Sequence, residues 1–202
     1  MVSVYDFKPR FQSMLRPISR RLHGAGITPN MVTVASMLMC AGAGGLLSYF
    51  YSVQYAACIV PIVSLLRMAM NAIDGMIARE YELCSKKGAL FNELFDVLSD
   101  MCLYVPLCAV FAADTSYAIA IVACFALVEF VGVLGIGLSR QRQYQGPFGK
   151  SDRALYFGIA ASIHAFSPLS PVAVHMVFGV AIFLSALTII RRSQSAIRSE
   201  IS

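Results

Sequence analysis

Long uncharged apolar runs, separated by short polar turns, constrain the fold of this chain more than any other feature. Residues 31–53 contain no charged side chain, and roughly 20 mainly apolar residues are enough to cross a bilayer as a helix. Charged residues make up 13% of the chain, mean hydropathy is +0.70, and a soluble domain carries about 25% charge. We therefore predict an all-α integral membrane protein.

The apolar runs predict six transmembrane helices, at residues 31–53, 55–79, 88–113, 116–139, 154–167 and 172–190. The fifth is short for a span unless it begins within residues 151–153. Gly42, Gly44 and Gly45 in the first span favour close helix contact. Because no linker or second composition interrupts the chain, we expect residues 27–202 to form one membrane domain.

Residues 1–26 have a different pattern, in which apolar positions recur with a helical period among basic side chains. These positions are Phe7, Phe11, Met14 with Leu15, Ile18 and Leu22. They predict an amphipathic interfacial helix lying on an anionic leaflet, kinked at Pro9 and Pro17. We expect no signal peptide here, since no apolar segment follows the basic residues directly.

Lysine and arginine divide the predicted turns into two sides. The turns near Ser52, Asp114 and Ser167 carry neither, and the opposite side carries Arg79, Lys86, Lys87, Arg140, Arg142, Lys150, Arg153, Arg191 and Arg192. The positive-inside rule then places both termini and residues 71–100 on the cytoplasmic side of the inner membrane. The six cysteines follow no metal-ligand spacing, and we expect them to be reduced packing residues.

Residues 71–100 bring carboxylates to the membrane edge, where acids are costly and mark functional sites. The amides and acids that follow helical spacing are Asn71, Asp74, Asn92, Asp96 and Asp100. A short turn at residues 80–87 joins the two segments. An antiparallel pair of helices would therefore bring Asn71 and Asp74 opposite Asn92 and Asp96.

Oxygen ligands of this kind suit a hard cation, so these five residues predict a site for one or two Mg²⁺ or Mn²⁺ ions. A divalent cation beside basic side chains suits a phosphate or diphosphate substrate. A carboxylate near the ion can act as a general base. The alternative is that the acids form structural ion pairs with Arg67, Arg79 and the lysines.

These residues resemble the class-I CDP-alcohol phosphatidyltransferases, whose signature is D-x-x-D-G-x-x-A-R, a short spacer and G-x-x-x-D-x-x-x-D. This chain reads Asn71-x-x-Asp74-Gly75-x-x-Ala78-Arg79 and then Gly88-x-x-x-Asn92-x-x-x-Asp96. Upstream, Thr28-Pro29-Asn30-x-x-Thr33 is similar to the family's T-P-N-x-x-T. The resemblance covers most of the chain and is nearest to the YnbA-like bacterial branch.

The resemblance implies a metal-dependent membrane enzyme of phospholipid synthesis. It would transfer a phosphatidyl group from CDP-diacylglycerol to an alcohol acceptor and release CMP, as a homodimer and with no nucleic-acid partner. Asp96 would be the catalytic base. Nucleotide and diphosphate would contact Asn30, Thr33, Asp74, Gly75, Ala78, Arg79 and Gly88.

Asn71 and Asn92 depart from the signature, which has aspartate at both positions. Each amide keeps a coordinating oxygen but removes one negative charge, so we expect weaker metal binding or one ion fewer unless Asp100 or Glu93 compensates. The alternative function is a degenerate homologue that binds CDP-lipid, or acts as a scaffold, without the usual catalysis. The intact D-G-x-x-A-R element disfavours a small transporter.

Residues 141–153 form a further candidate segment, with Gly146, Pro147 and Gly149 shaping a loop. Its anion-binding groups are Arg142, Lys150 and Arg153. Similarity to a G-K segment of the family implies that they bind the acceptor, and positive-inside anchoring is the alternative.

Two charged residues lie within the predicted spans and therefore require partners. Arg67 could bind phosphate or pair with Asp100. Glu129, in the middle of the fourth span, requires an arginine or a water-lined cavity, and we predict a structural or cavity-lining role for it.

Overall fold

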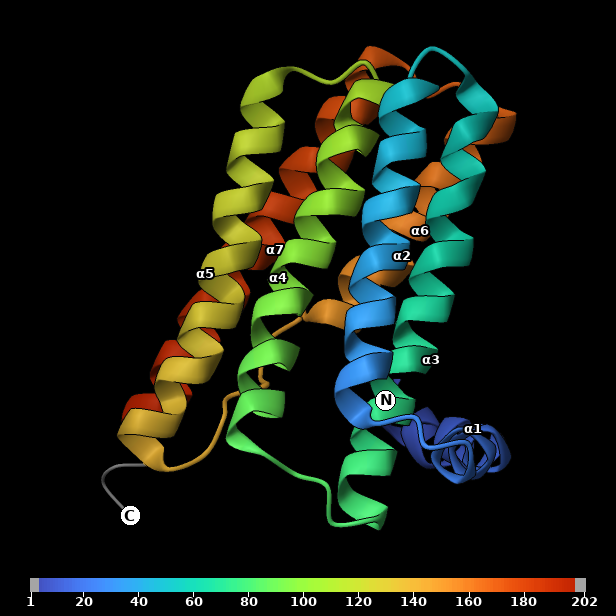
Figure 1. Cartoon of the computed structure of the whole chain (residues 1–202). Coiled ribbons are helices and arrows are strands. Elements are labelled where there is room, and N and C mark those ends of the chain that lie inside the picture. The colour runs from blue at the N-terminus through green and yellow to red at the C-terminus, as the bar shows by residue number, and fades with distance from the viewer. Residues whose placement is uncertain (1–3, 199–202) are drawn as a thin grey trace.

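The computed structural model describes residues 4–198, with side chains from Phe11 onward, and its regular elements there are all helical (Figure 1). In order these are α1 (Val4–Gly24), α2 (Pro29–Tyr49), the 3-10 turn η1 (Gln54–Cys58), α3 (Ile59–Glu80), α4 (Lys86–Val110), α5 (Thr115–Ser139), α6 (Lys150–Phe166) and α7 (Pro171–Arg198). The positions predicted at Phe7 and Pro9 lie outside the described side chains. Residues 1–3 and 199–202 lie outside the described chain.

Helices α2 to α7 form an elongated bundle, and α1 lies across one end of it (Figure 1). The α3–α4 turn, the α5–α6 loop and the last turns of α7 lie at that same end. Helix α1 is anchored there on α3, where Arg16 pairs with Glu80 at 3.0 Å and the His23 ring stacks on Tyr81 at 3.6 Å. The arrangement places the basic residues and the motif residues at one end of the bundle.

Four helical segments are long and apolar enough to cross a membrane: α2, Gln54–Glu80, α5 and α7. Helix α4 is polar through its first half, and α6 has 17 residues. Neither α4 nor α6 is among these four candidate spans, although both lie within the same bundle (Figure 1). The count of six spans is therefore still a prediction. Helix α6 corresponds to the predicted fifth span. It begins at Lys150 and therefore includes residues 151–153, which the short apolar run needed in order to reach the length of a span.

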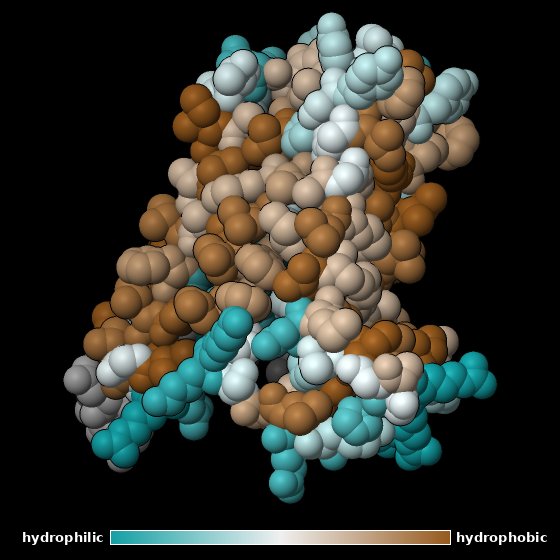
Figure 2. Space-filling view, viewed as in Figure 1, coloured by the Kyte–Doolittle hydropathy of each residue, from teal (hydrophilic) through white to brown (hydrophobic). Residues whose placement is uncertain are grey.

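The surface also has the polarity of a membrane protein. In Figure 2, apolar side chains cover the middle of the bundle, and hydrophilic ones gather at the end that carries α1. The exposed apolar side chains come from several helices and include Leu65, Ile119, Phe130, Leu155 and Met176. The chain is thus a multi-pass membrane protein by fold and surface.

Helix α2 lies between α3 and α4 and packs against both (Figure 1). A Cβ atom on Gly44 would lie 1.9 Å from the carbonyl oxygen of Cys102, so only glycine permits this approach of α2 to α4. Gly42 and Gly45 have nothing within 4 Å of such a Cβ, so the predicted close contact rests on Gly44 alone.

Candidate active site

Five side chains from four helices gather between α3 and α4, and Asn92 lies one turn before one of them, Asp96. We call these six residues the polar site: Thr33, Asn71, Asp74, Asn92, Asp96 and Lys150. The Nδ2 of Asn71 donates to Oδ1 of Asp96 at 3.0 Å. The predicted approach of the two motif segments is therefore found, with Asn71 reaching Asp96 across the gap. Asn92 is half-buried on the same face of α4, one turn before Asp96.

Asp74 is 6% exposed and accepts a hydrogen bond from the hydroxyl of Thr33 at 2.8 Å. Thr33 is positioned by the start of α2, where the Thr28 hydroxyl accepts a hydrogen bond from the backbone N–H of Met31 at 3.3 Å. Among the ion pairs within the described chain, none involves Asp74. Its carboxylate is therefore buried against a neutral hydroxyl and has no direct ion pair.

Asp96 has the opposite surroundings. The ammonium of Lys150 contacts its Oδ2, while Asn71 and Arg67 approach its Oδ1 at 3.0 and 3.4 Å. Arg67 also donates to the backbone carbonyl of Asp96 at 2.8 Å. Both carboxylate oxygens of Asp96 are therefore engaged by N–H groups, two of which belong to cationic side chains.

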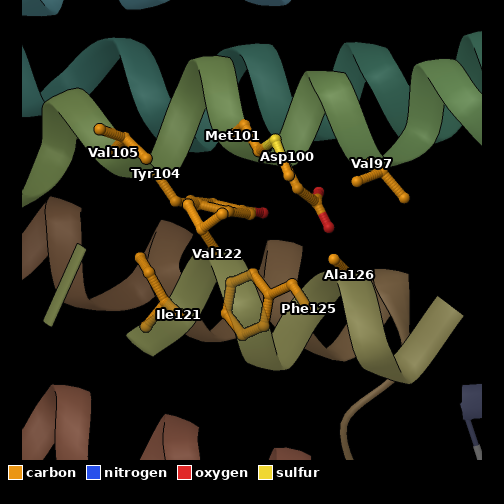
Figure 3. Close-up of a pocket in the computed structure, with 9 residues that line it drawn as sticks. All are labelled: Val97, Asp100, Met101, Tyr104, Val105, Ile121, Val122, Phe125 and Ala126. Carbon is orange, nitrogen blue, oxygen red and sulfur yellow. The ribbon is translucent and has the colours of Figure 1, made fainter. Parts of the chain in front are cut away.

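Asp100 lies one turn further along α4 and is directed away from the polar site. It pairs with Arg67 through Oδ1, and its Oδ2 lies 2.7 Å from Nη2 of Arg153. Figure 3 shows its carboxylate projecting from α4 toward α5, beside a cavity of about 10 Å³ that Tyr104 and Phe125 also line. Of the two roles considered for Arg67, the structure shows the ion pair with Asp100.

A second cluster surrounds Glu129, and we call Glu129, Arg142, Arg153 and Arg192 the Glu129 network. The Glu129 carboxylate is 3% exposed and lies 2.7 Å from Arg142, 2.8 Å from Arg153 and 3.6 Å from Arg192. The predicted arginine partner of Glu129 is confirmed three times over. Arg153 has no exposed surface, and its guanidinium pairs with Asp100 and Glu129.

Arg192 was not predicted from the sequence as part of any site. It donates to the Val128 carbonyl at 2.6 Å and to the Gln145 carbonyl at 3.2 Å, which joins α7 to α5 and to the α5–α6 loop. A signal was present, because Ser185, Thr188 and Arg192 form a buried polar stripe at helical spacing on an otherwise apolar helix.

The α5–α6 loop is fixed on this network and delivers Lys150 to the polar site. Gly146 has φ +117° and would press a Cβ within 2.6 Å of Thr188, so glycine is required there. The Phe148 backbone N–H donates to the Thr188 hydroxyl at 3.0 Å, and Asp152 accepts from the Gly149 N–H at 2.9 Å. The ammonium of Lys150 is therefore held by a well-anchored helix start.

The residues expected around nucleotide and diphosphate lie beside the polar site, at the end of the bundle that carries the α3–α4 turn. A Cβ on Gly88 would lie 2.8 Å from Oδ1 of Asn30, which brings the α2 and α4 motifs together. A Cβ on Gly75 would lie 3.1 Å from Nη1 of Arg79. Ala78 is half-buried on the same helix. The two glycines thus allow the side chains of Asn30 and Arg79 to lie close against the backbone of the motif segments.

Of the five residues predicted to bind a metal ion, Asn71, Asp74 and Asn92 have oxygens that fit a divalent cation, whereas Asp96 and Asp100 do not. Among the side chains that the structure describes, from Phe11 to Arg198, no group of three or more histidine, cysteine or acidic residues is arranged to hold a metal ion. Asp74 keeps an oxygen without a cationic partner, and the side-chain oxygens of Asn71 and Asn92 are hard donors on the facing helices. Asp96 and Asp100 are held by lysine or arginine instead.

Comparison with known proteins shows which family the chain is similar to. The family model for CDP-alcohol phosphatidyltransferase matches residues 26–191. The inner membrane protein YnbA of Escherichia coli (strain K12) is 37% identical over 196 residues, which is 97% of either chain.

Two solved structures have the same fold. The Mycobacterium tuberculosis phosphatidylinositol phosphate synthase PgsA1 with CDP-DAG bound has a TM-score of 0.72 at 19% identity, covering 91% of this chain and 94% of its own. The same synthase with manganese and citrate has a TM-score of 0.71 at 20% identity, covering 90% and 88%. At this identity the likeness concerns the fold alone.

Proposed function

Because the chain belongs to the CDP-alcohol phosphatidyltransferase family, we propose that it transfers a phosphatidyl group from CDP-diacylglycerol to an alcohol acceptor and releases CMP. The observation that carries this proposal is the meeting of both motif segments in the polar site, where Asn71 contacts Asp96 and Thr33 contacts Asp74. The PgsA1 structure with CDP-DAG bound supports the lipid substrate by fold.

A groove between α3 and α6 fits the acyl chains of such a substrate. It has a volume of about 350 Å³, and its apolar lining includes Pro61, Leu65, Met68, Leu155 and Ile159. Ser151 and Asp152, directly after Lys150, line it as well. A lipid lying in the groove would therefore have its head group beside the polar site and its chains on the apolar flank.

In the reaction, an oxygen of the acceptor alcohol attacks the phosphorus that bears diacylglycerol. A P–O bond forms to the acceptor, the bond to the phosphate of CMP breaks, and the acceptor's proton leaves. We assign that proton to Asp96, because it is the last acid of the motif and a general base must reach the acceptor hydroxyl. Arg79 and Lys150 lie where they can offset the charge of the diphosphate.

A divalent cation would be held by Asp74 with the side-chain oxygens of Asn71 and Asn92. When bound, it would neutralise charge on the diphosphate. The manganese of the related PgsA1 structure supports this assignment. Chelation should then abolish nucleotide binding or turnover, and full activity in excess chelator would contradict it.

The acceptor is proposed to lie on the α5–α6 side of Asp96. Lys150, whose side chain is 26% exposed, and Arg142 would contact it, with Arg153 buried behind them. These cations favour an acceptor that carries a phosphate or carboxylate. We also propose, from family resemblance, that the enzyme acts as a homodimer.

Both termini and the polar site are proposed to be cytoplasmic, because basic residues are concentrated at that end. Cys84, exposed in the α3–α4 turn, provides a native probe. A membrane-impermeant maleimide should label it in inverted vesicles and not in right-side-out ones. Labelling only in right-side-out vesicles would reverse the orientation.

The decisive experiment is release of CMP from radiolabelled CDP-diacylglycerol by purified protein against a panel of alcohols with and without phosphate groups. Asp74→Ala should remove turnover and bound metal together. Asp114→Asn is the matched control, because this acid caps α5 at the opposite end of the bundle and asparagine caps equally well. CDP-lipid binding without turnover on any alcohol would favour the degenerate homologue.

A further inference from the structure

We propose that Lys150 takes the place of a divalent cation at Asp96, so that this site is built for one exchangeable metal ion, on Asp74, and one cation supplied by the chain. The inference rests on the proposed function for the identity of the site. It assigns to Lys150 the compensation of the negative charge of Asp96, and to Asn71 a hydrogen bond to the same carboxylate.

The first step concerns Asp96. Two oxygens of a buried carboxylate are available to a metal, but here one contacts the Lys150 ammonium and the other accepts from Asn71 at 3.0 Å. Arg67 adds a second positive charge at 3.4 Å. A divalent ion at Asp96 would have to displace Lys150 and lie against Arg67, and like charges at such distances repel strongly in a buried site.

The second step concerns Asn71, whose amide donates to Asp96. An aspartate at this position would place two carboxylates about 3 Å apart, an arrangement that requires a cation or a shared proton between them. The amide removes the repulsion and makes a hydrogen bond instead. Asn71 and Lys150 therefore act together, since each satisfies one oxygen of Asp96.

The third step concerns how the ammonium is held. Lysine loses side-chain entropy when fixed, but Lys150 extends from a helix start that is already anchored by the Gly149–Asp152 hydrogen bond and the Phe148–Thr188 hydrogen bond. Its side chain remains 26% exposed, whereas Asp74, without a cationic partner, is 6% exposed. Asp74 is therefore the acid of the polar site that has no direct ion pair among the described residues.

The test counts bound Mn²⁺ by electron paramagnetic resonance on purified protein, without any turnover. The unmodified chain should hold one Mn²⁺. Asn71→Asp with Asn92→Asp should add a second, weak ion, and adding Lys150→Met should tighten that ion about tenfold or more, because a competing positive charge is gone. Lys150→Arg in the same background should keep it weak.

Lys86→Met is the matched control, since this exposed lysine lies at the same end and should change nothing. Circular dichroism confirms that each variant is folded. Two equally tight ions in the unmodified chain would overturn the proposal, as would a second ion whose affinity is indifferent to Lys150→Met. If the unmodified chain holds no Mn²⁺ but the triple variant does, the role of Lys150 stands and the proposed metal on Asp74 fails.

Discussion

Two buried polar clusters lie side by side along α4, and they balance their charges differently. In the Glu129 network, one carboxylate is surrounded by three arginines, and Arg153 continues to Asp100. In the polar site, Asp96 pairs with Lys150 and Arg67, and Asp74 forms no ion pair among the described residues. The Glu129 carboxylate thus has its cationic partners within the chain, whereas in the polar site the carboxylate of Asp74 is left for a ligand to neutralise.

The contrast suggests different roles for the two clusters: the Glu129 network stabilises the bundle, and the polar site is the part that a substrate can reach. The network joins α5, α6, α7 and the α5–α6 loop, so its contacts hold the bundle end together. The polar site joins α2, α3, α4 and the first turn of α6 around groups that remain in reach of a substrate. Arg67 links the two through Asp100, because it pairs with Asp96 of the polar site and with Asp100, which in turn pairs with Arg153 of the network.

The sharpest way to break this comparison is to change the two acids of α4 that lie one turn apart. Asp96→Asn should lower transfer by about 10²–10⁴-fold, because the base is lost while the amide keeps the volume. CDP-lipid binding should persist. Asp100→Asn should act on folding instead and be milder on transfer per folded molecule. If Asp100→Asn abolishes catalysis and Asp96→Asn does not, the motif register is off by one turn.

Glu129→Leu should have the largest effect on stability. It leaves Arg142, Arg153 and Arg192 buried around an apolar side chain, and removing one partner of a buried ion pair costs about 3–5 kcal/mol. Denaturant unfolding in detergent, followed by circular dichroism, measures the change. Glu93→Gln is the control, because Glu93 is more exposed and pairs with Arg142 only. Equal unfolding curves for Glu129→Leu and unmodified protein would refute the structural role.

Two glycines allow the same small change to be made in each cluster. A Cβ on Gly88 would meet Asn30 at 2.8 Å, and one on Gly132 would meet Arg192 at 2.8 Å. Overpacking costs about 1–3 kcal/mol, so Gly88→Ala should weaken CDP-lipid binding and Gly132→Ala should lower stability. Gly45→Ala, with nothing within 4 Å, should change neither. Identical profiles for the two variants would erase the distinction between the clusters.

The smallest effect is expected at a charge pair that belongs to neither cluster. Arg16 and Glu80 pair at 3.0 Å on the surface, between α1 and α3. Exposed pairs contribute about 0–1 kcal/mol and weaken with salt. Arg16→Gln should therefore shift unfolding by less than about 1 kcal/mol, and a loss comparable to that of Glu129→Leu would show that α1 is part of the folded core.

Apolar periodicity and motif spacing predicted the helices and the approach of Asn71 to Asp96, because both depend on residues near one another in the sequence. The requirement of a charged residue for a partner predicted an arginine or a water-lined cavity at Glu129, and phosphate or Asp100 at Arg67. The structure shows the arginine and the ion pair with Asp100. These predictions rest on local spacing and on the cost of burying charge, which a sequence displays directly.

The remaining contacts depend on how distant helices pack. The close approach of α2 to α4 depends on Gly44 lying against Cys102, and the sequence does not show which of the three glycines of α2 makes that contact. Lys150 contacts Asp96 only because the α5–α6 loop is anchored on Thr188 of α7. Arg191 and Arg192 are adjacent in sequence, yet only Arg192 turns inward. The sequence cannot distinguish these neighbours until the rotation of α7 is known.

The groove between α3 and α6 is bordered by Leu65, Leu155 and Ile159, which are exposed on the flank of the bundle. A lipid that enters there moves sideways within its leaflet, so its chains never pass through water, where each exposed methylene would cost about 0.8 kcal/mol. Encounter with the enzyme is then a two-dimensional search. Its rate depends on the mole fraction of CDP-lipid in the membrane, and dilution with inert lipid should slow the reaction even when the bulk concentration is constant.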